Sequence, residues 1–269
     1  MTNVAVAPQI ENRREFAEGP VMDRSRVLRA YRTEAKYESL RMLRSPAFAG
    51  PFLIMPVALY MLFGYVLFGA AIGKDPKAAL FMFMGFSVMG VMGPGLFGFG
   101  ISVATEREQG LLRLKRALPV PPAATLLGKM LMSMLFVAII MATMTAAAPL
   151  VHVQLSAASV IALSLVNIMG SLPFCAMGFF IGSLVSAKSA PAFVNLLYIP
   201  MIYLSAILFP MPKSLEWIAF LSPAYHLSQT GLASIGAASS GNVVVHIGGL
   251  AAVTIAFTAL AVRRLARRG

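Results

Sequence analysis

Residues 130–187 read MLMSMLFVAIIMATMTAAAPLVHVQLSAASVIALSLVNIMGSLPFCAMGFFIGSLVSA, which is 58 consecutive positions without an Asp, Glu, Lys or Arg. A helix that crosses a lipid bilayer needs about 20 apolar residues, so this stretch has room for two such helices. Pro149, His152 and Gln154 supply a polar break near its middle. We therefore predict two membrane spans here, at residues 130–149 and 157–184.

Four further windows also lack charged residues, at positions 45–73, 78–105, 189–212 and 217–262. The first three predict one span each, at residues 48–72, 78–103 and 191–209. The last window is polar as far as Asn242, so only residues 243–262 are apolar enough to span. The whole chain is 58% hydrophobic and 12% charged, whereas soluble domains carry about 25% charged residues. The sequence thus predicts an all-α membrane protein with six transmembrane helices.

The net charge of +12 first suggests a nucleic-acid partner, but its distribution points elsewhere. Six spans place both termini on one side of the membrane, and 19 of the 22 Lys and Arg residues fall on that side. The opposite side has only Lys74, Lys77 and Lys213. Because cytoplasmic loops are enriched in Lys and Arg, we predict cytoplasmic termini, a bacterial inner membrane, and no nucleic-acid partner.

The cytoplasmic N-terminal region divides into two parts. Residues 1–23 have mixed charge and no periodicity, which predicts a disordered leader. Residues 24–45 predict an amphipathic helix that lies along the inner leaflet, ahead of a six-span domain at residues 46–269. Its apolar stripe faces away from a basic arc and consists of Val27, Leu28, Tyr31, Ala35 and Met42. A simple topological stop is the alternative interpretation.

The predicted spans contain no charged side chain at their centres, so they lack the ion-carrying groups of many coupled carriers. The three histidines (His152, His226 and His246) are far apart in sequence, and Cys175 is the one cysteine. We therefore predict no metal site and no catalytic residue. Neither Gly-Lys pair, at residues 73–74 and 128–129, is followed by Ser or Thr, so no P-loop is present. Any ATP must be bound by another chain.

Two motifs stand at defined places relative to these spans. Residues 105–122 read TEREQGLLRLKRALPVPP, and residues 199–226 read IPMIYLSAILFPMPKSLEWIAFLSPAYH. The first resembles the segment that couples permeases of the ABC type-2 transporter family to their ATPase. The second resembles the fifth span of that family, followed by a short outward re-entrant hairpin between spans five and six. With the six spans, the resemblance covers residues 24–268.

The resemblance implies an exporter permease that works as a homodimer, with two copies of a separate ATPase subunit that bind ATP and Mg²⁺. It implies no cofactor on this chain itself. The residues implied to couple to the ATPase are Glu106, Arg107, Glu108, Gly110, Leu112 and Arg113. The residues implied to form an outer gate are Phe209, Pro210, Glu216, Trp217, Pro223 and Tyr225.

Only the amino-acid composition gives information about the transported compound. The chain has 18 Met and 18 Phe residues, and such soft apolar side chains suit varied hydrophobic ligands. This favours export of an amphiphilic or hydrophobic compound such as a drug, natural product or lipid. The candidate path residues are Phe86, Met89, Phe97, Asn195, Tyr198 and Tyr203. Export of a lipid-linked polysaccharide, or a non-transporting membrane anchor for an ATPase, are the alternatives.

Overall fold

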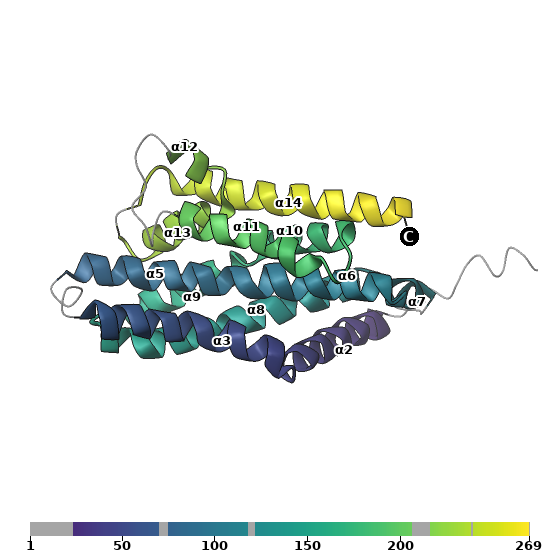
Figure 1. Cartoon of the computed structure of the whole chain (residues 1–269), viewed down its shortest axis with the longest axis horizontal. Coiled ribbons are helices and arrows are strands. Elements are labelled where there is room, and N and C mark those ends of the chain that lie inside the picture. Colours follow the sequence, from purple (N-terminus) through teal and green to yellow (C-terminus); the bar gives the residue numbers. More distant parts are fainter. Residues whose placement is uncertain (1–23, 70–74, 118–121, 206–215, 238, 269) are drawn as a thin grey trace, which may run out of the picture.

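The computed structural model describes residues 24–69, 75–117, 122–205, 216–237 and 239–268, and their regular structure is helical without strands (Figure 1). The predicted leader, residues 1–23, lies outside this described part. The helices are α2 (Arg24–Leu43), α3 (Pro46–Met61), η1 (Leu62–Leu67), α5 (Pro76–Gly93), η2 (Pro94–Phe99), α6 (Gly100–Glu108), α7 (Leu111–Ala117), α8 (Pro122–Ala147), η3 (Ala148–Val151), α9 (Ala157–Met169), α10 (Leu172–Leu184), α11 (Ala190–Leu204), α12 (Glu216–Ala219), α13 (Pro223–Ser234) and α14 (Val243–Arg268).

Five continuous helical segments among the described residues are long and apolar enough to cross a membrane. They are Pro46–Leu67, Pro76–Glu108, Ala123–Val151, Ala157–Leu184 and Val243–Leu265. The sixth predicted span, residues 191–209, corresponds to α11, which has 15 residues. At 1.5 Å per residue α11 is about 22 Å long, shorter than a bilayer core of about 30 Å. The remainder of that predicted span lies outside the described residues.

Local sequence explains where several helices begin. Proline, whose missing N–H costs nothing in a first helical turn, stands at the start of α3, α5 and α13. Asp75 caps α5 by accepting hydrogen bonds from the backbone N–H groups of Lys77 (2.9 Å) and Ala78 (3.3 Å). Ser156 caps α9 in the same way through the N–H of Ser159 (3.1 Å). These features place the helix starts within a few residues of the predicted ones.

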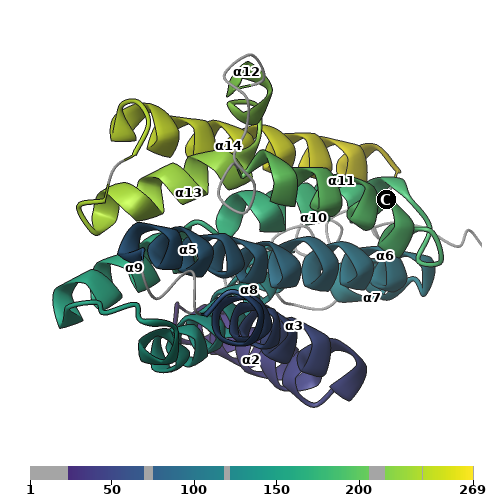
Figure 2. The same cartoon turned by 60° about the vertical axis from the view of Figure 1, so that its left-hand side comes forward.

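The helix formed by α5, η2 and α6 runs through the middle of the molecule. Figures 1 and 2 show α2, α3 and α8 on one side of it and α11, α13 and α14 on the other. Its side chains are the most deeply buried of the five apolar segments, and Phe83, Met92 and Phe99 are fully covered. The Met- and Phe-rich surface that suggested a cargo path is therefore largely the core of this chain.

Glycines bring this central helix and α10 into backbone contact. A Cβ atom built on Gly178 would lie 2.6 Å from the carbonyl oxygen of Gly95, and one on Gly100 would lie 3.1 Å from that of Gly178. Only glycine permits such an approach, which small-x-x-x-small motifs allow between membrane helices. Gly182 makes a similar approach, since a Cβ atom there would clash with the carbonyl oxygen of Gly100.

Two helices extend further than the charges in their sequence suggested. The second predicted span was ended at residue 103 and the third was begun at residue 130, whereas the observed segments run to Glu108 and start at Ala123. The reason is that Glu106 and Lys129, taken as boundary markers, are buried and bonded to each other inside the fold. A charged side chain with an internal partner does not have to end a helix at the water boundary.

Candidate functional site

The motif at residues 105–122 forms a helix, a turn and a short helix at one end of the bundle. The helix α6 ends at Glu108, and α7 begins at Leu111. Gly110 between them has a φ of +71°, a left-handed conformation that glycine adopts without steric cost. The polypeptide can therefore change direction directly after Glu108.

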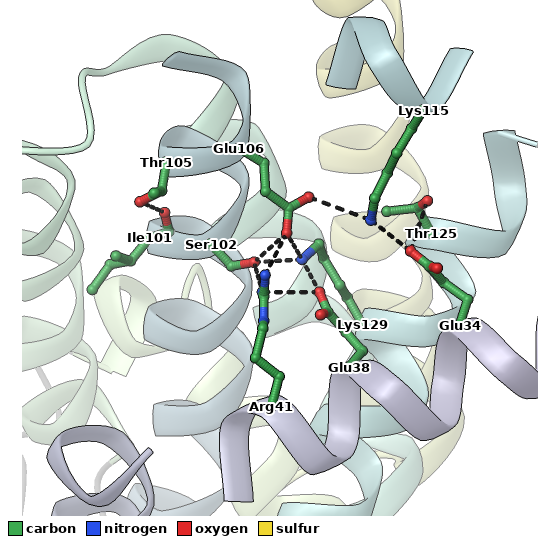
Figure 3. Close-up of polar contacts among 10 residues, drawn as sticks. All are labelled: Glu34, Glu38, Arg41, Ile101, Ser102, Thr105, Glu106, Lys115, Thr125 and Lys129. Atoms are coloured by element: carbon green, nitrogen blue, oxygen red, sulfur yellow. Dashed lines mark hydrogen bonds and ion pairs between the residues drawn. The ribbon is translucent and has the colours of Figure 1, made fainter. Parts of the chain in front are cut away.

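A cluster of charged and polar side chains lies beneath this turn, and we call it the basal cluster. It joins Glu38 and Arg41 of α2, Ser102 and Glu106 of α6, and Lys129 of α8 (Figure 3). Lys129 Nζ is 2.7 Å from Glu106 Oε1 and also contacts the Glu38 carboxylate and the Ser102 hydroxyl. Glu38, Glu106 and Lys129 are 6%, 2% and 1% exposed. These three charges are thus removed from water, and Lys129 contacts both carboxylates.

Arg41 closes the basal cluster from the side of α2. Its guanidinium donates to Glu106 Oε1 (3.1 Å), Glu38 Oε1 (3.1 Å) and Ser102 Oγ (2.8 Å). Two carboxylates therefore face two cations, and the buried site is formally neutral. Such a balance matters because an unpaired buried charge carries a desolvation penalty of several kcal/mol.

A second ion pair connects α7 to the basal cluster. Lys115 Nζ lies 2.6 Å from Glu34 Oε1 of α2, and Thr125 of α8 donates to the same oxygen at 3.1 Å. Lys115 also lies 3.8 Å from Glu106 Oε2 (Figure 3). The short helix after the turn is consequently paired with α2 and α6, and Thr125 joins α8 to the same Glu34 oxygen.

The residues implied to couple to an ATPase are placed in different environments. Glu106 does not face a partner in this structure, because its carboxylate is enclosed in the basal cluster. Arg107 donates to the backbone carbonyls of Ser183 and Val185 (2.6 Å to Val185), where a cation complements the C-terminal end of α10. Both side chains thus have partners within the chain, and their role in coupling to an ATPase stays a prediction.

The remaining members of that set lie at the surface or near it. Glu108 is exposed, Gly110 forms the turn, and Leu112 is partly covered. The side chain of Arg113 lies outside the described part of the chain. Leu114, one residue further, is 59% exposed. Among the described side chains of this segment, Glu108, Gln109 and Leu114 are exposed and within reach of a partner.

The candidate path residues fall into two groups. Phe86 and Met89 are buried in the core. Phe97 and Tyr198 form an edge-to-face pair with centroids 5.3 Å apart, and the Tyr198 hydroxyl donates to the Met89 carbonyl at 3.2 Å. Those two aromatic rings join α11 to the central helix. Further along α11, Asn195 and Tyr203 are exposed.

The candidate outer gate lies at the opposite end of the bundle, around α12 and α13 (Figure 1). Phe209 and Pro210 lie outside the described residues, as does the side chain of Glu216. Trp217 is exposed, whereas Pro223 and Tyr225 are buried at the start of α13. Nearly all of α13 is buried, and it packs against α14, α9 and α5.

Sequence reasoning missed several residues that the fold brings together. Glu38, Ser102 and Lys129 were not singled out, although Glu34 and Glu38 stand one helical turn apart as the acidic residues of an otherwise basic helix, which was an available signal. The interpretation of the histidines as distant from one another was wrong for one pair. His226 Nδ1 lies 2.9 Å from His246 Nδ1.

Comparisons with known proteins agree with the helical frame and the two motifs. Residues 29–235 match the family model described as ABC-2 type transporter. A protein of Bacillus subtilis (strain 168), described as "Putative transport permease YvfS", is 29% identical over 193 residues, which cover 70% of this chain and 78% of that relative. The chain belongs to the ABC-2 type transporter family, and it is a transmembrane permease of that family.

Proposed function

We propose that the chain is the membrane subunit of an ATP-driven exporter in a bacterial inner membrane, with both termini in the cytoplasm. Two copies enclose the transport path, and two separate ATPase subunits dock at the end that carries the basal cluster. The observation that carries this proposal is the match to the ABC-2 type transporter family across residues 29–235. The orientation follows from the 19 basic residues on one side and three on the other.

The ATPase contact is assigned to the exposed part of the turn between α6 and α7. Glu108 offers a charge, and Leu114 offers an apolar side chain beside it. Below them, Lys115 connects α7 to Glu34, and the basal cluster connects α2, α6 and α8. This arrangement supports two separate roles. Glu108 and Leu114 bind the ATPase, and the helices joined by the buried charges move together as a rigid body when the ATPase moves.

The outer face of α2 is assigned to the anionic headgroups of the inner leaflet. Both of its acidic residues in the middle of the helix, Glu34 and Glu38, turn inward and are paired. The exposed basic side chains of α2 outside the basal cluster are Arg24, Arg26, Arg29, Arg32 and Lys36. Four members of the predicted apolar stripe are partly covered, and Leu28 is exposed. Basic segments of this kind favour anionic lipid by about 1 kcal/mol per residue close to the surface.

The cargo is proposed to be an amphiphilic or hydrophobic compound that passes along α11. This helix exposes large apolar side chains, including Phe193, Leu196 and Ile199, and the polar Asn195 between them. A second copy of the chain packed against this face would line a path with apolar walls and few hydrogen-bonding groups. A polysaccharide would require many more polar contacts, so competition by amphiphilic dyes against transport distinguishes the two cargo classes.

The isolated chain is expected to hydrolyse no ATP, because its sequence contains no P-loop to hold the phosphates. The measurement is phosphate release by the purified chain in lipid nanodiscs, with and without a purified ABC ATPase subunit. Turnover that appears only with the ATPase supports the proposal. ATP turnover by the purified chain without any ATPase subunit would contradict it.

We assign Leu114 as an anchor of the ATPase interface. Leu114→Ala is therefore expected to weaken the complex about tenfold, equivalent to about 1.4 kcal/mol, since the few anchor residues of an interface each contribute more than about 1 kcal/mol. Glu108→Ala is expected to lower transport per ATP hydrolysed. Binding is measured by titrating labelled ATPase onto nanodiscs, and coupling by cargo uptake into inverted vesicles. The matched control is Leu221→Ala, a leucine 73% exposed at the other end of the bundle. Equal effects of the two leucine substitutions would refute this docking surface.

A further inference from the structure

Two buried histidines meet between α13 and α14, at the end of the bundle opposite the basal cluster (Figures 1 and 2). His226 is 4% exposed and His246 is 1% exposed. Their Nδ1 atoms are 2.9 Å apart, within hydrogen-bond distance. Since neutral imidazole has one donor and one acceptor nitrogen, this contact requires a proton on one of the two Nδ1 atoms and a lone pair on the other.

The surrounding bonds determine which ring donates. His246 Nε2 lies 2.6 Å from the backbone carbonyl of Ser240. A carbonyl only accepts, so Nε2 of His246 carries the proton and its Nδ1 is the acceptor. His226 Nδ1 is therefore the donor in the neutral pair. The side chain of Gln229 in α13 accepts a hydrogen bond from the N–H of Ser240 at 2.7 Å. Ser240 is therefore bonded both to His246 of α14 and to Gln229 of α13.

The surroundings of the pair disfavour positive charge. The rings of Phe220 and Tyr225 pack against both histidines, with centroids 4.9 to 6.1 Å away. Gly249 of α14 leaves the space that the His226 ring occupies, since a Cβ there would lie 2.7 Å from His226 Nε2. Both histidines stand in the first turn or just after it, where the helix dipole opposes a cation. Among the described residues, the titratable group that faces the pair is the phenol of Tyr225, and no described carboxylate contacts either ring.

We propose that His226 and His246 form a proton-binding latch, which holds α13 against α14 while the pair is neutral and releases it when the rings are protonated. A proton on His246 Nδ1 removes the acceptor and leaves two donors facing each other. A proton on His226 places a cation in an apolar site at a helix N-terminus. In the orientation proposed above, the latch lies on the outer side of the membrane, so that external acidification would loosen the end of the bundle where cargo leaves.

The direction of the pH effect follows from linkage. His226 lies in α13, outside the five apolar segments. Burial is the main cause that lowers the pKa of His226, and the neighbouring charge of His246 lowers it further. A hydrogen bond to the Phe220 backbone acts in the opposite direction. In the open state the ring returns to water and to a pKa of about 6.5. A lowered pKa in the latched state means that the latch is stable above this value and weakens as the pH falls below it. Between pH 7.5 and pH 5.5, His226 alone would raise the opening equilibrium by no more than about tenfold, the limit set by an open-state pKa of about 6.5.

The test uses the fluorescence of Trp217, the one tryptophan in the chain. It lies on α12, three residues before Phe220, whose ring contacts both histidines. The full chain in lipid nanodiscs is titrated from pH 8 to pH 5. We expect a reversible transition below about pH 6.5 in the wild type. His226→Asn, whose amide can still donate to His246 but does not titrate, removes the contribution of His226 and is expected to weaken the transition.

The control is His152→Asn. His152 is exposed and has a φ of 59°, a conformation that Asn tolerates, so this variant is expected to titrate like the wild type. Because His226→Asn could perturb folding, ¹⁵N-histidine spectra of the wild-type chain in bilayers provide a measurement without that variant. They are expected to show Nε2–H on His246 and Nδ1–H on His226 at pH 8. A transition that persists unchanged in His226→Asn, or a proton on Nδ1 of His246 at pH 8, would overturn the latch.

Discussion

Replacement of Lys129 by Met is expected to lower the free energy of unfolding by about 3–5 kcal/mol, the usual cost of removing one partner from a buried ion pair. Methionine fills much of the same volume, so the loss measures charge rather than packing. Lys129 is the cation nearest to both Glu38 and Glu106, and only Arg41 and Lys115 would remain to compensate these two carboxylates. Unfolding of the chain in mixed micelles, monitored by circular dichroism, provides the measurement.

A double substitution separates electrostatics from packing in this experiment. Replacing Glu38 by Met as well removes the carboxylate that Lys129 contacts, so the pair Glu38→Met and Lys129→Met should be less destabilising than the sum of the two single changes. Residues in contact show coupling of about 0.5–3 kcal/mol in such cycles. Lys188→Met, at an exposed position, is the control and should change stability by less than about 0.5 kcal/mol. Additive single effects would show that the basal cluster does not act as a unit.

The two glutamates of the motif at residues 105–122 have different roles, because Glu106 is buried in the basal cluster and Glu108 is exposed. Loss of Glu106 removes a buried acceptor for Lys129 and Arg41, so its substitution should reduce folding and transport together. Loss of Glu108 removes an exposed charge and should leave folding unchanged. A joint substitution of both glutamates therefore cannot report on coupling, and only Glu108→Ala with intact Glu106 can.

The second large effect is expected for Gly178→Ala, which should destabilise the chain by about 1–3 kcal/mol, the cost of inserting a methyl group into a well-packed core. The new Cβ would meet the carbonyl oxygens of Gly95 and Leu96 at 2.6 and 2.9 Å. Because both atoms belong to the backbone of the central helix, neither can rotate away as a side chain could. The two helices would have to separate, which the same unfolding measurement detects.

The matched control for this substitution is Gly248→Ala in α14. A Cβ atom at Gly248 meets nothing within 4 Å, and alanine is favoured over glycine in a helix interior by about 0.5–1 kcal/mol. Gly248→Ala should therefore leave stability unchanged or raise it. If Gly178→Ala proves equally harmless, the close contact between α10 and the central helix is not required for the fold.

The sequence predicted the membrane class, most of the spans and the family because these depend on local properties. The length of a charge-free run determines whether a helix can cross a bilayer, and residues 130–187 satisfy that condition twice without reference to any other part of the chain. Gly110 likewise acts on the backbone next to it, where it forms the turn between α6 and α7. The motif could therefore be located from its own residues.

The sequence could not predict which charges would be internal. Glu38 and Lys129 are 91 positions apart, and Glu106 and Lys129 are 23 apart. Each could have faced water, lipid or a partner protein. The histidines present the same difficulty, since residues 226 and 246 are adjacent only because α13 folds back against α14.

The net charge of +12 and the helical spans were thus determined by the amino-acid sequence itself, since hydrophobicity and positive charge act on each segment separately. Tertiary structure alone decided that Glu106 is a buried partner of Lys129, that Arg107 binds the end of α10, and that Glu108 remains exposed. The physical reason is that a charge is stable in a protein interior only where distant helices deliver its counter-charge, and that depends on how the helices pack.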